Sequence, residues 1–97
     1  MNILIKPSDR KEKKYDAVIG GKKKISFGQK GASDMTQHKS EVRKKRYIDR
    51  HKARENWNDP KTAGFMSRWL LWNKPTLTES IRNINKRFPF VHVSLGR

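Results

Sequence analysis

The chain contains no cysteine among its 97 residues. The absence of thiols excludes disulfide bonds, thiolate metal sites and cysteine nucleophiles together, and it is compatible with a reducing compartment. Acidic residues are also scarce, because 9 Asp and Glu stand against 24 Lys and Arg, which gives a formal net charge of +15. Such a charge opposes compaction and favours an anionic partner, with nucleic acid first and anionic membranes or acidic protein surfaces behind it.

Long apolar runs are lacking as well. No window approaches the roughly eighteen consecutive apolar residues of a transmembrane helix. The short run Ile3-Leu4-Ile5 is not followed by the small-residue cleavage site of a signal peptide. We therefore expect a protein that is not secreted and has no membrane partner. Hydrophobic residues make up only 33% of the chain, so we expect one small domain over residues 1–97 with a modest core.

The basic residues are spread along the whole chain. Residues 1–30 carry 9 of them, residues 31–57 carry 8 and residues 58–97 carry 7. A neutral domain with a basic tail would concentrate them at one end. The distribution therefore predicts a basic body.

Alternating apolar residues on either side of Gly20-Gly21 predict a β-hairpin over residues 14–28, after an N-terminal arm over residues 1–13. A Gly-Gly pair supplies the positive φ angles that a two-residue hairpin turn requires. The apolar positions form one face that must pack on another element: Tyr15, Ala17, Ile19, Ile25 and Phe27. Residues 28–39 are small and polar, which is typical of a loop.

A basic helix is predicted over residues 40–57. Ser40 is a suitable N-cap, and Glu41 suits the positive end of the helix dipole. The apolar stripe around Tyr47 and Ile48 is thin, so this helix offers more charge than core.

A tryptophan-rich helical hairpin is predicted over residues 62–88, followed by residues 89–97 as a short strand or C-terminal arm. The segment Thr76-Leu77-Thr78-Glu79 has the pattern of a capping box. Apolar residues then follow at helical spacing: Leu77, Ile81, Ile84 and Phe88. Together these elements predict an α+β fold, with an N-terminal β-hairpin followed by a basic helix and a compact helical hairpin.

The sequence contains no complete motif for catalysis or metal binding. His38, His51 and His92 form no HExxH or His-x-His arrangement with a carboxylate, and FGQKG lacks the strand–loop–helix context of a nucleotide site. We predict no metal, no cofactor and no enzyme activity. One alternative stays open, because RYIDRHKAREN contains the residue types of a small nuclease around Arg50 and His51. The ordinary interpretation is a half-buried His51 beside Tyr47.

The lysines and arginines predict phosphate contacts, each of which releases counterions and makes binding depend on salt. The expected contacts lie at the hairpin tip and along the basic helix: Lys22, Lys23, Lys24, Lys39, Arg43, Lys44, Arg46, Arg50, His51 and Arg54. The alternative is that these side chains form a charged surface that contacts only solvent. Because the whole chain carries a large positive charge, we favour binding of a polyanion.

The large aromatic side chains have three alternative uses. Trp57, Trp69 and Trp72 can stack on unpaired bases, which contributes ~1–3 kcal/mol per base. They can also form the core, which we expect above all for Phe65 and Trp69. Trp57 and Trp72 are the residues most suited to anchor a protein interface instead.

The segments TQHK, RYIDRHKARENW and SRWLLWNKPTLTESI carry a resemblance that extends from about Lys14 to Phe88. They resemble a family of small, functionally uncharacterised basic proteins, a domain of unknown function, encoded by tailed phages and by large DNA viruses of algae and protists. The family has no established enzyme activity, so the resemblance carries over no catalytic residue. It implies a viral protein that handles DNA or RNA, or a minor capsid protein near the genome.

We therefore expect a small, basic, non-enzymatic viral protein that binds nucleic acid. The alternative is a minor structural protein of the virion whose basic and aromatic surfaces bind acidic patches of capsid subunits, as part of a large assembly. Either function places the protein in the virion, or in the cytoplasm or nucleus of the infected cell.

Overall fold

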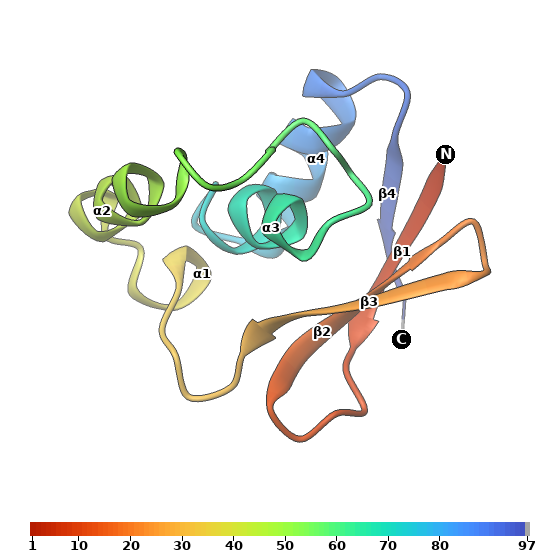
Figure 1. Ribbon diagram of the computed structural model, residues 1–97, viewed down its shortest axis with the longest axis horizontal. Coiled ribbons are helices and arrows are strands. Elements are labelled where there is room, and N and C mark those ends of the chain that lie inside the picture. The colour runs from red at the N-terminus through yellow and green to blue at the C-terminus, as the bar shows by residue number, and fades with distance from the viewer. Residues whose placement is uncertain (97) are drawn as a thin grey trace.

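A four-stranded sheet with the strand order β3-β2-β1-β4 forms one layer of the protein. The computed structural model describes residues 1–96, and Figure 1 shows the helices gathered beside the sheet. The strands are β1 (Asn2–Pro7), β2 (Lys13–Ile19), β3 (Lys23–Gln29) and β4 (His92–Leu95). The helices are α1 (Met35–His38), α2 (Glu41–His51), α3 (Ala63–Met66), the π-helical turn η1 (Ser67–Leu71) and α4 (Leu77–Arg87). The α+β class predicted from the sequence is confirmed.

Strand β1 corrects the expectation of an N-terminal arm over residues 1–13. It lies inside the sheet, antiparallel to β2 and parallel to β4. Ile3 and Ile5 point into the core, with 1% and 0% of their surface exposed. The apolar run Ile3-Leu4-Ile5 is too short to predict a central strand from the sequence. One of the two strands that pair with β1, β4, lies about 90 residues further along the chain.

Strands β2 and β3 pair antiparallel on either side of Gly20 and Gly21, which have φ angles of 59° and 72°. The register pairs Ile19 with Lys23, so the loop contains Gly20, Gly21 and Lys22, one residue more than the two-residue turn expected from the sequence. Left-handed backbone at both glycine positions is the geometry that favours glycine. The pairs Tyr15↔Phe27 and Ala17↔Ile25 place apolar side chains side by side on the core face.

Strand β4 occupies part of the expected C-terminal arm, residues 89–97. The side-chain amide of Asn85 on α4 holds its free edge, because Nδ2 donates to the Val93 carbonyl at 3.0 Å and Oδ1 accepts from the Val93 amide at 2.7 Å. These two bonds satisfy backbone groups that an edge strand otherwise leaves unpaired.

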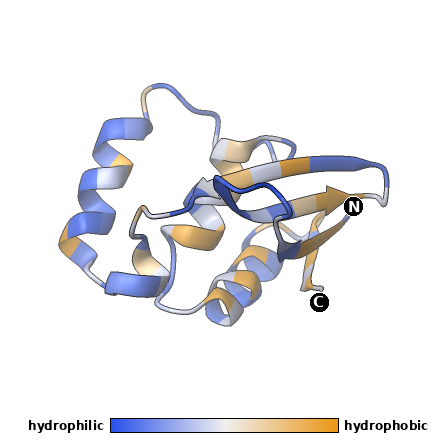
Figure 2. Ribbon diagram, turned by 90° about the horizontal axis from the view of Figure 1, so that it is seen from below, coloured by the Kyte–Doolittle hydropathy of each residue, from blue (hydrophilic) through white to orange (hydrophobic). Residues whose placement is uncertain are grey.

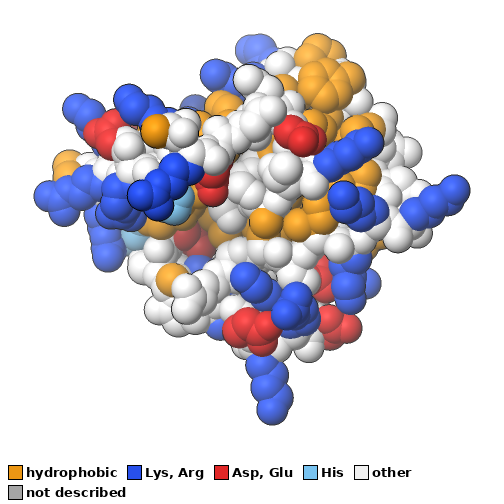
Figure 3. Space-filling model, in the orientation of Figure 1, with side chains coloured by type: hydrophobic (Ala, Val, Ile, Leu, Met, Phe, Trp, Pro, Cys, Tyr) orange, Lys and Arg blue, Asp and Glu red, His pale blue; other side chains and the backbone are white. Residues whose placement is uncertain are grey.

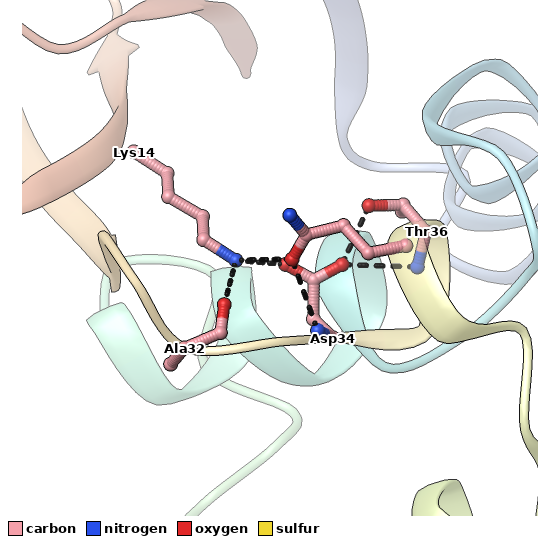
Figure 4. A network of polar contacts seen from close by, with 5 residues as sticks. Lys14, Ala32, Asp34 and Thr36 are labelled. Carbon is pink, nitrogen blue, oxygen red and sulfur yellow. Dashed lines mark hydrogen bonds and ion pairs between the residues drawn. The ribbon is translucent and has the colours of Figure 1, made fainter.

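Helix α1 replaces part of the loop expected over residues 28–39. Asp34 caps it by accepting from the Thr36 amide at 2.9 Å, and the Gln37 side chain accepts from the Asp34 amide at 3.2 Å. Lys14 on β2 pairs with the same Asp34 and donates to the Ala32 carbonyl at 2.6 Å (Figure 4). This network ties α1, and through it α2, to the sheet.

Helix α2 is shorter than the basic helix expected over residues 40–57. Ser40 is its N-cap and accepts from the Arg43 amide at 3.3 Å, but the helix ends at His51 and residues 52–54 form a turn. Beyond His51 the segment lacks an apolar stripe, and a helix of this length depends on such packing. Figure 2 shows α2 as a mainly hydrophilic helix at one end of the molecule.

The predicted helical hairpin over residues 62–88 divides into α3, η1 and α4. Thr62 caps α3, and Thr76 caps α4 by accepting from the Glu79 amide at 3.2 Å. The π-helical turn between them buries Trp69, Leu70 and Leu71. Helix α3 and η1 pack along β3, while α4 packs on η1 and β4.

The core lies between one face of the sheet and these helices. Its fully buried members come from the strands, α3, η1 and α4, including Ile5, Phe27, Phe65, Leu70 and Ile84. Over residues 1–96, no helix has the length and hydropathy required to cross a membrane.

Candidate nucleic-acid interface

Helix α2 carries a row of exposed arginines. Arg43, Arg46 and Arg50 follow one another at spacings of three and four, which places them along one side of the helix. Lys45 is also exposed, and Lys39, Lys52 and Arg54 continue the positive charge beyond the two ends of α2. Figure 3 shows Lys and Arg side chains gathered at the end of the molecule formed by α2.

The arginines of this row have no carboxylate partner. The ion pairs of α2 join Lys44 to Glu41 at 3.9 Å and Lys52 to Asp49 at 3.8 Å. Within residues 1–96, no ion pair involves Arg43, Arg46 or Arg50, so their guanidinium groups are available to an external anion.

Lys44 differs from the other predicted phosphate contacts because it lies on the inner side of α2. Only 19% of its side chain is exposed. Burial lowers the pKa of Lys44; the nearby Arg68 and Lys74 lower it further, whereas Glu41 opposes them. Lys44, which was expected among the phosphate contacts, is therefore mostly buried and is not part of the exposed row of Arg43, Arg46 and Arg50.

The hairpin tip does not join the α2 surface. In Figures 1 and 2 the turn between β2 and β3 lies at the opposite end of the long axis from α2. Lys22 and Lys23 are exposed there, whereas Lys24 approaches Asp9 at 3.6 Å and Asp16 at 3.8 Å. The predicted basic residues therefore form two separate groups.

A stack of aromatic rings holds the inner side of α2. Tyr47 stacks on Trp72 with ring centroids 4.6 Å apart and an interplanar angle of 4°, and it stacks on His51 at 4.3 Å and 28°. Trp57 lies 6.4 Å from Tyr47, and His38 lies 5.2 Å from Trp72. Trp72 and Trp57 thus contribute to internal packing.

Two of the rings in this stack, those of Trp57 and His38, form hydrogen bonds. The Trp57 indole N–H donates to Glu55 at 2.7 Å, and His38 Nδ1 accepts from the Ser40 amide at 2.9 Å. Burial raises the pKa of Tyr47 well above its usual value, and Glu55 adds to this effect. Tyr47 therefore stays neutral at any physiological pH.

Phe65 and Trp69 lie in the core, as expected from their spacing. Trp69 donates its indole N–H to the Trp57 carbonyl at 2.8 Å. Two guanidinium groups lie over its ring, those of Arg68 at 4.2 Å and Arg87 at 4.5 Å from the centroid. Spacing in the sequence did not reveal the Arg87 contact, since it joins η1 to the end of α4, whereas Arg68 is the neighbour of Trp69 within η1.

A cleft of about 450 Å³ lies next to α2. Tyr47, Arg50 and His51 line it from α2, and Trp72 and Leu71 line it from the π-helical turn and the residue after it. The far wall comes from the hairpin and the loop that follows it: Lys13, Lys14, Ser26, Phe27, Gly28, Gln29, Ala32, Ser33 and Asp34. Sequence reasoning did not predict this hollow, because its walls lie far apart in the chain.

His51, around which a small nuclease was considered, lies beside Tyr47 with its Nδ1 3.8 Å from Glu55. Among residues 1–96, no three His, Asp or Glu side chains come together as metal ligands. The His51 ring thus packs on Tyr47 and has one carboxylate, that of Glu55, beside it.

Comparison with known proteins gives a single assignment. No curated protein and no solved structure matches the chain. The sequence profile of a family of unknown function, DUF5754, matches residues 3–51. The match begins in β1 and ends at the last residue of α2, so it covers β1, β2, β3 and both helices that follow them. The chain belongs to the DUF5754 family of unknown function.

Proposed function

We propose that this protein is a small, non-enzymatic viral protein that binds nucleic acid through phosphate contacts of α2. The observation that carries the proposal is the row of exposed, unpaired arginines formed by Arg43, Arg46 and Arg50. The net charge of +15 supports it, because a surface with this excess attracts polyanions over long distances. The viral setting rests on the sequence resemblance alone.

The dimensions of α2 suit this function. Eleven residues at about 1.5 Å of rise give a helix roughly 16 Å long. Duplex DNA carries one negative charge for about every 1.7 Å of its axis, so a helix of this length faces several phosphates. Because the row makes charge contacts with the backbone, binding depends strongly on salt and little on base sequence.

A double variant tests the role of α2. Arg43→Gln with Arg46→Gln removes two charges from the row, and Lys22→Gln with Lys23→Gln removes two from the hairpin tip as a matched control. Binding is measured by fluorescence anisotropy of a labelled oligonucleotide over a salt series. The α2 variant is expected to flatten the slope of log K against log salt by about 1 for each lost contact.

The control is expected to keep a slope close to that of the unaltered protein. Equal losses in both variants would show that net charge alone governs binding. Affinity that does not change with salt would contradict the proposed phosphate contacts altogether.

A minor capsid function is the second candidate, and exposed apolar side chains near the C-terminal strand favour it. Phe90 and Leu95 expose 57% and 51% of their surface, and such residues serve as contacts for another protein. Proteomics of purified virions before and after genome release tests it. Retention in the empty shell supports a capsid component, whereas loss with the genome supports a packaged nucleic-acid binder.

A further inference from the structure

The aromatic stack of α2 ends on a ring that is open to solvent. Tyr47 stacks on both Trp72 and His51, while no stacking contact joins His51 to Trp72 within residues 1–96. Tyr47 also stacks on Trp57 at 6.4 Å, so it joins His51 to the two tryptophans. It is buried, with 7% of its surface exposed, whereas 39% of the His51 side chain is exposed.

The open ring belongs to the cleft beside α2. His51 lines this cleft together with Arg50, the last member of the arginine row. A strand whose phosphates follow the row therefore passes the mouth of the cleft at Arg50. The volume of about 450 Å³ is ample for a flat heterocycle.

Charged side chains of both signs line the cleft. Its cations are Lys13, Lys14 and Arg50, and its two carboxylates, Asp34 and Glu55, already have partners. Asp34 pairs with Lys14, while Glu55 accepts from the Trp57 indole and lies 3.8 Å from His51 Nδ1. A flat, uncharged base inside the cleft meets hydrogen-bonding groups and the aromatic face of His51. Arg50, which lines the cleft and has no ion pair within residues 1–96, is available to an adjacent phosphate.

We propose that the cleft binds one unpaired nucleobase, which stacks on His51 while an adjacent phosphate pairs with Arg50. The inference rests on the proposed function and specifies its ligand as single-stranded nucleic acid, because a paired base cannot leave its duplex to enter the cleft without an energetic cost. His51 then acts through the face of its ring. Base stacking on aromatic side chains tolerates any sequence, since every base has a π-face.

Two variants of one residue separate stacking from charge. His51→Phe keeps an aromatic face and loses the ring nitrogens, whereas His51→Ala loses both. Each is titrated with a single-stranded oligonucleotide and with a duplex of the same length. His51→Ala is expected to weaken single-strand binding by about tenfold and to leave duplex binding unchanged, while His51→Phe retains single-strand affinity.

Direct contact is measured with 2-aminopurine in the oligonucleotide, whose fluorescence falls when the base stacks. Quenching by the unaltered protein and by His51→Phe, with none by His51→Ala, is the expected result. Thermal unfolding of both variants is recorded alongside, because His51 also packs on Tyr47. If His51→Ala unfolds, His51→Gln replaces it as the variant without an aromatic ring.

The outcomes distinguish this inference from the proposed function. Salt-dependent binding that is lost on changing Arg43 and Arg46, but is equal for single strands and duplexes and indifferent to His51, overturns the base pocket alone. Loss of affinity in both His51→Ala and His51→Phe would assign a charge or hydrogen bond to His51 and overturn stacking. No binding to any nucleic acid overturns the proposed function as well.

Discussion

The rings of Tyr47 and Trp72 stack almost parallel, with centroids 4.6 Å apart, and this contact joins α2 to the rest of the molecule. Tyr47 is the buried residue of α2, whose remaining side chains are half-buried or exposed. The position of the arginine row therefore depends on one aromatic contact more than on the apolar stripe of the helix.

Replacing Tyr47 by alanine is expected to lower the free energy of unfolding by about 3 kcal/mol, as large-to-small changes of buried aromatic residues do. Tyr47→Phe is the matched control. It is expected to cost under about 1 kcal/mol, since the hydroxyl makes no hydrogen bond within the described residues. Urea denaturation of both variants measures the difference. Similar costs for both would show that the hydroxyl, and not the ring, holds α2.

His38 is expected to make stability fall in mild acid. Burial lowers its pKa, and Arg43 and Lys14 act in the same direction while Asp34 opposes them. The folded pKa lies below the unfolded value, so the stability that neutral His38 contributes is present above about pH 6.5 and is lost as the pH falls through the folded pKa.

Urea midpoints between pH 7.5 and 5.5 test this. His38→Asn keeps an acceptor for the Ser40 amide and does not titrate, so it is expected to flatten the profile. His92→Asn, at an exposed position, serves as the control. A profile unchanged by His38→Asn would assign the acid sensitivity to other groups.

The buried carboxylate of Asp16 is expected to depend on Ser26. Burial alone would raise the pKa of Asp16, but the hydrogen bond from Ser26, the nearby Ser8 hydroxyl and the charges of Lys24 and Lys6 together lower it. Ser26 donates to Asp16 Oδ1 at 2.6 Å across the β2–β3 pair. Ser26→Ala is therefore expected to cost about 2 kcal/mol at pH 7, because it removes a bond to a buried charge.

The stabilising effect of the Asp16 carboxylate is expected to decrease in acid. A lowered carboxylate pKa stabilises the fold above the unfolded value near 3.8 and ceases to do so as the pH falls through the folded value. The cost of Ser26→Ala is thus expected to shrink toward pH 2. Ser33→Ala in the exposed loop is the control, and an equal cost there would argue against a specific role for Ser26.

Gly28 is expected to tolerate alanine less well than Gly21. Both have positive φ angles, 77° and 72°, so both variants store about 1 kcal/mol of backbone strain. An added Cβ at Gly28 would lie 2.8 Å from Leu71 Cδ1, whereas nothing lies within 4 Å at Gly21. Leu71 is buried and has little room to move.

We expect Gly28→Ala to lower the free energy of unfolding by at least about 1 kcal/mol more than Gly21→Ala, through overpacking. Thermal denaturation compares the two. Recovery of stability in Gly28→Ala combined with Leu71→Val would identify the Leu71 contact as the cause. Equal destabilisation of the two single variants would leave backbone strain as the whole effect.

Local signals made several elements predictable. The Gly20-Gly21 pair indicates the turn between β2 and β3, Ser40 marks the start of α2, and the spacing from Leu77 to Phe88 defines α4. Each depends on neighbours within a few residues, which sequence patterns describe well. The burial of Phe65 and Trp69 followed from the same helical spacing.

The features that the sequence did not reveal depend on distant partners. The pairing of β1 with β4 joins segments about 90 residues apart, and the cleft beside α2 takes its walls from five elements and their connections. The separation of Lys22 and Lys23 from α2 follows from the direction of the hairpin. For α1 a local signal was present, since Asp34 and Gln37 have capping-box spacing.

The position of β1 between β2 and β4 also affects how the chain is made. Until the segment His92–Leu95 has emerged from the ribosome, one edge of β1 has no strand to pair with. Asn85 cannot bind the Val93 backbone before that point either. The sheet is therefore completed only after residues 92–95 have been synthesised, so shorter nascent chains of this protein expose an unpaired edge of β1 that the folded molecule conceals.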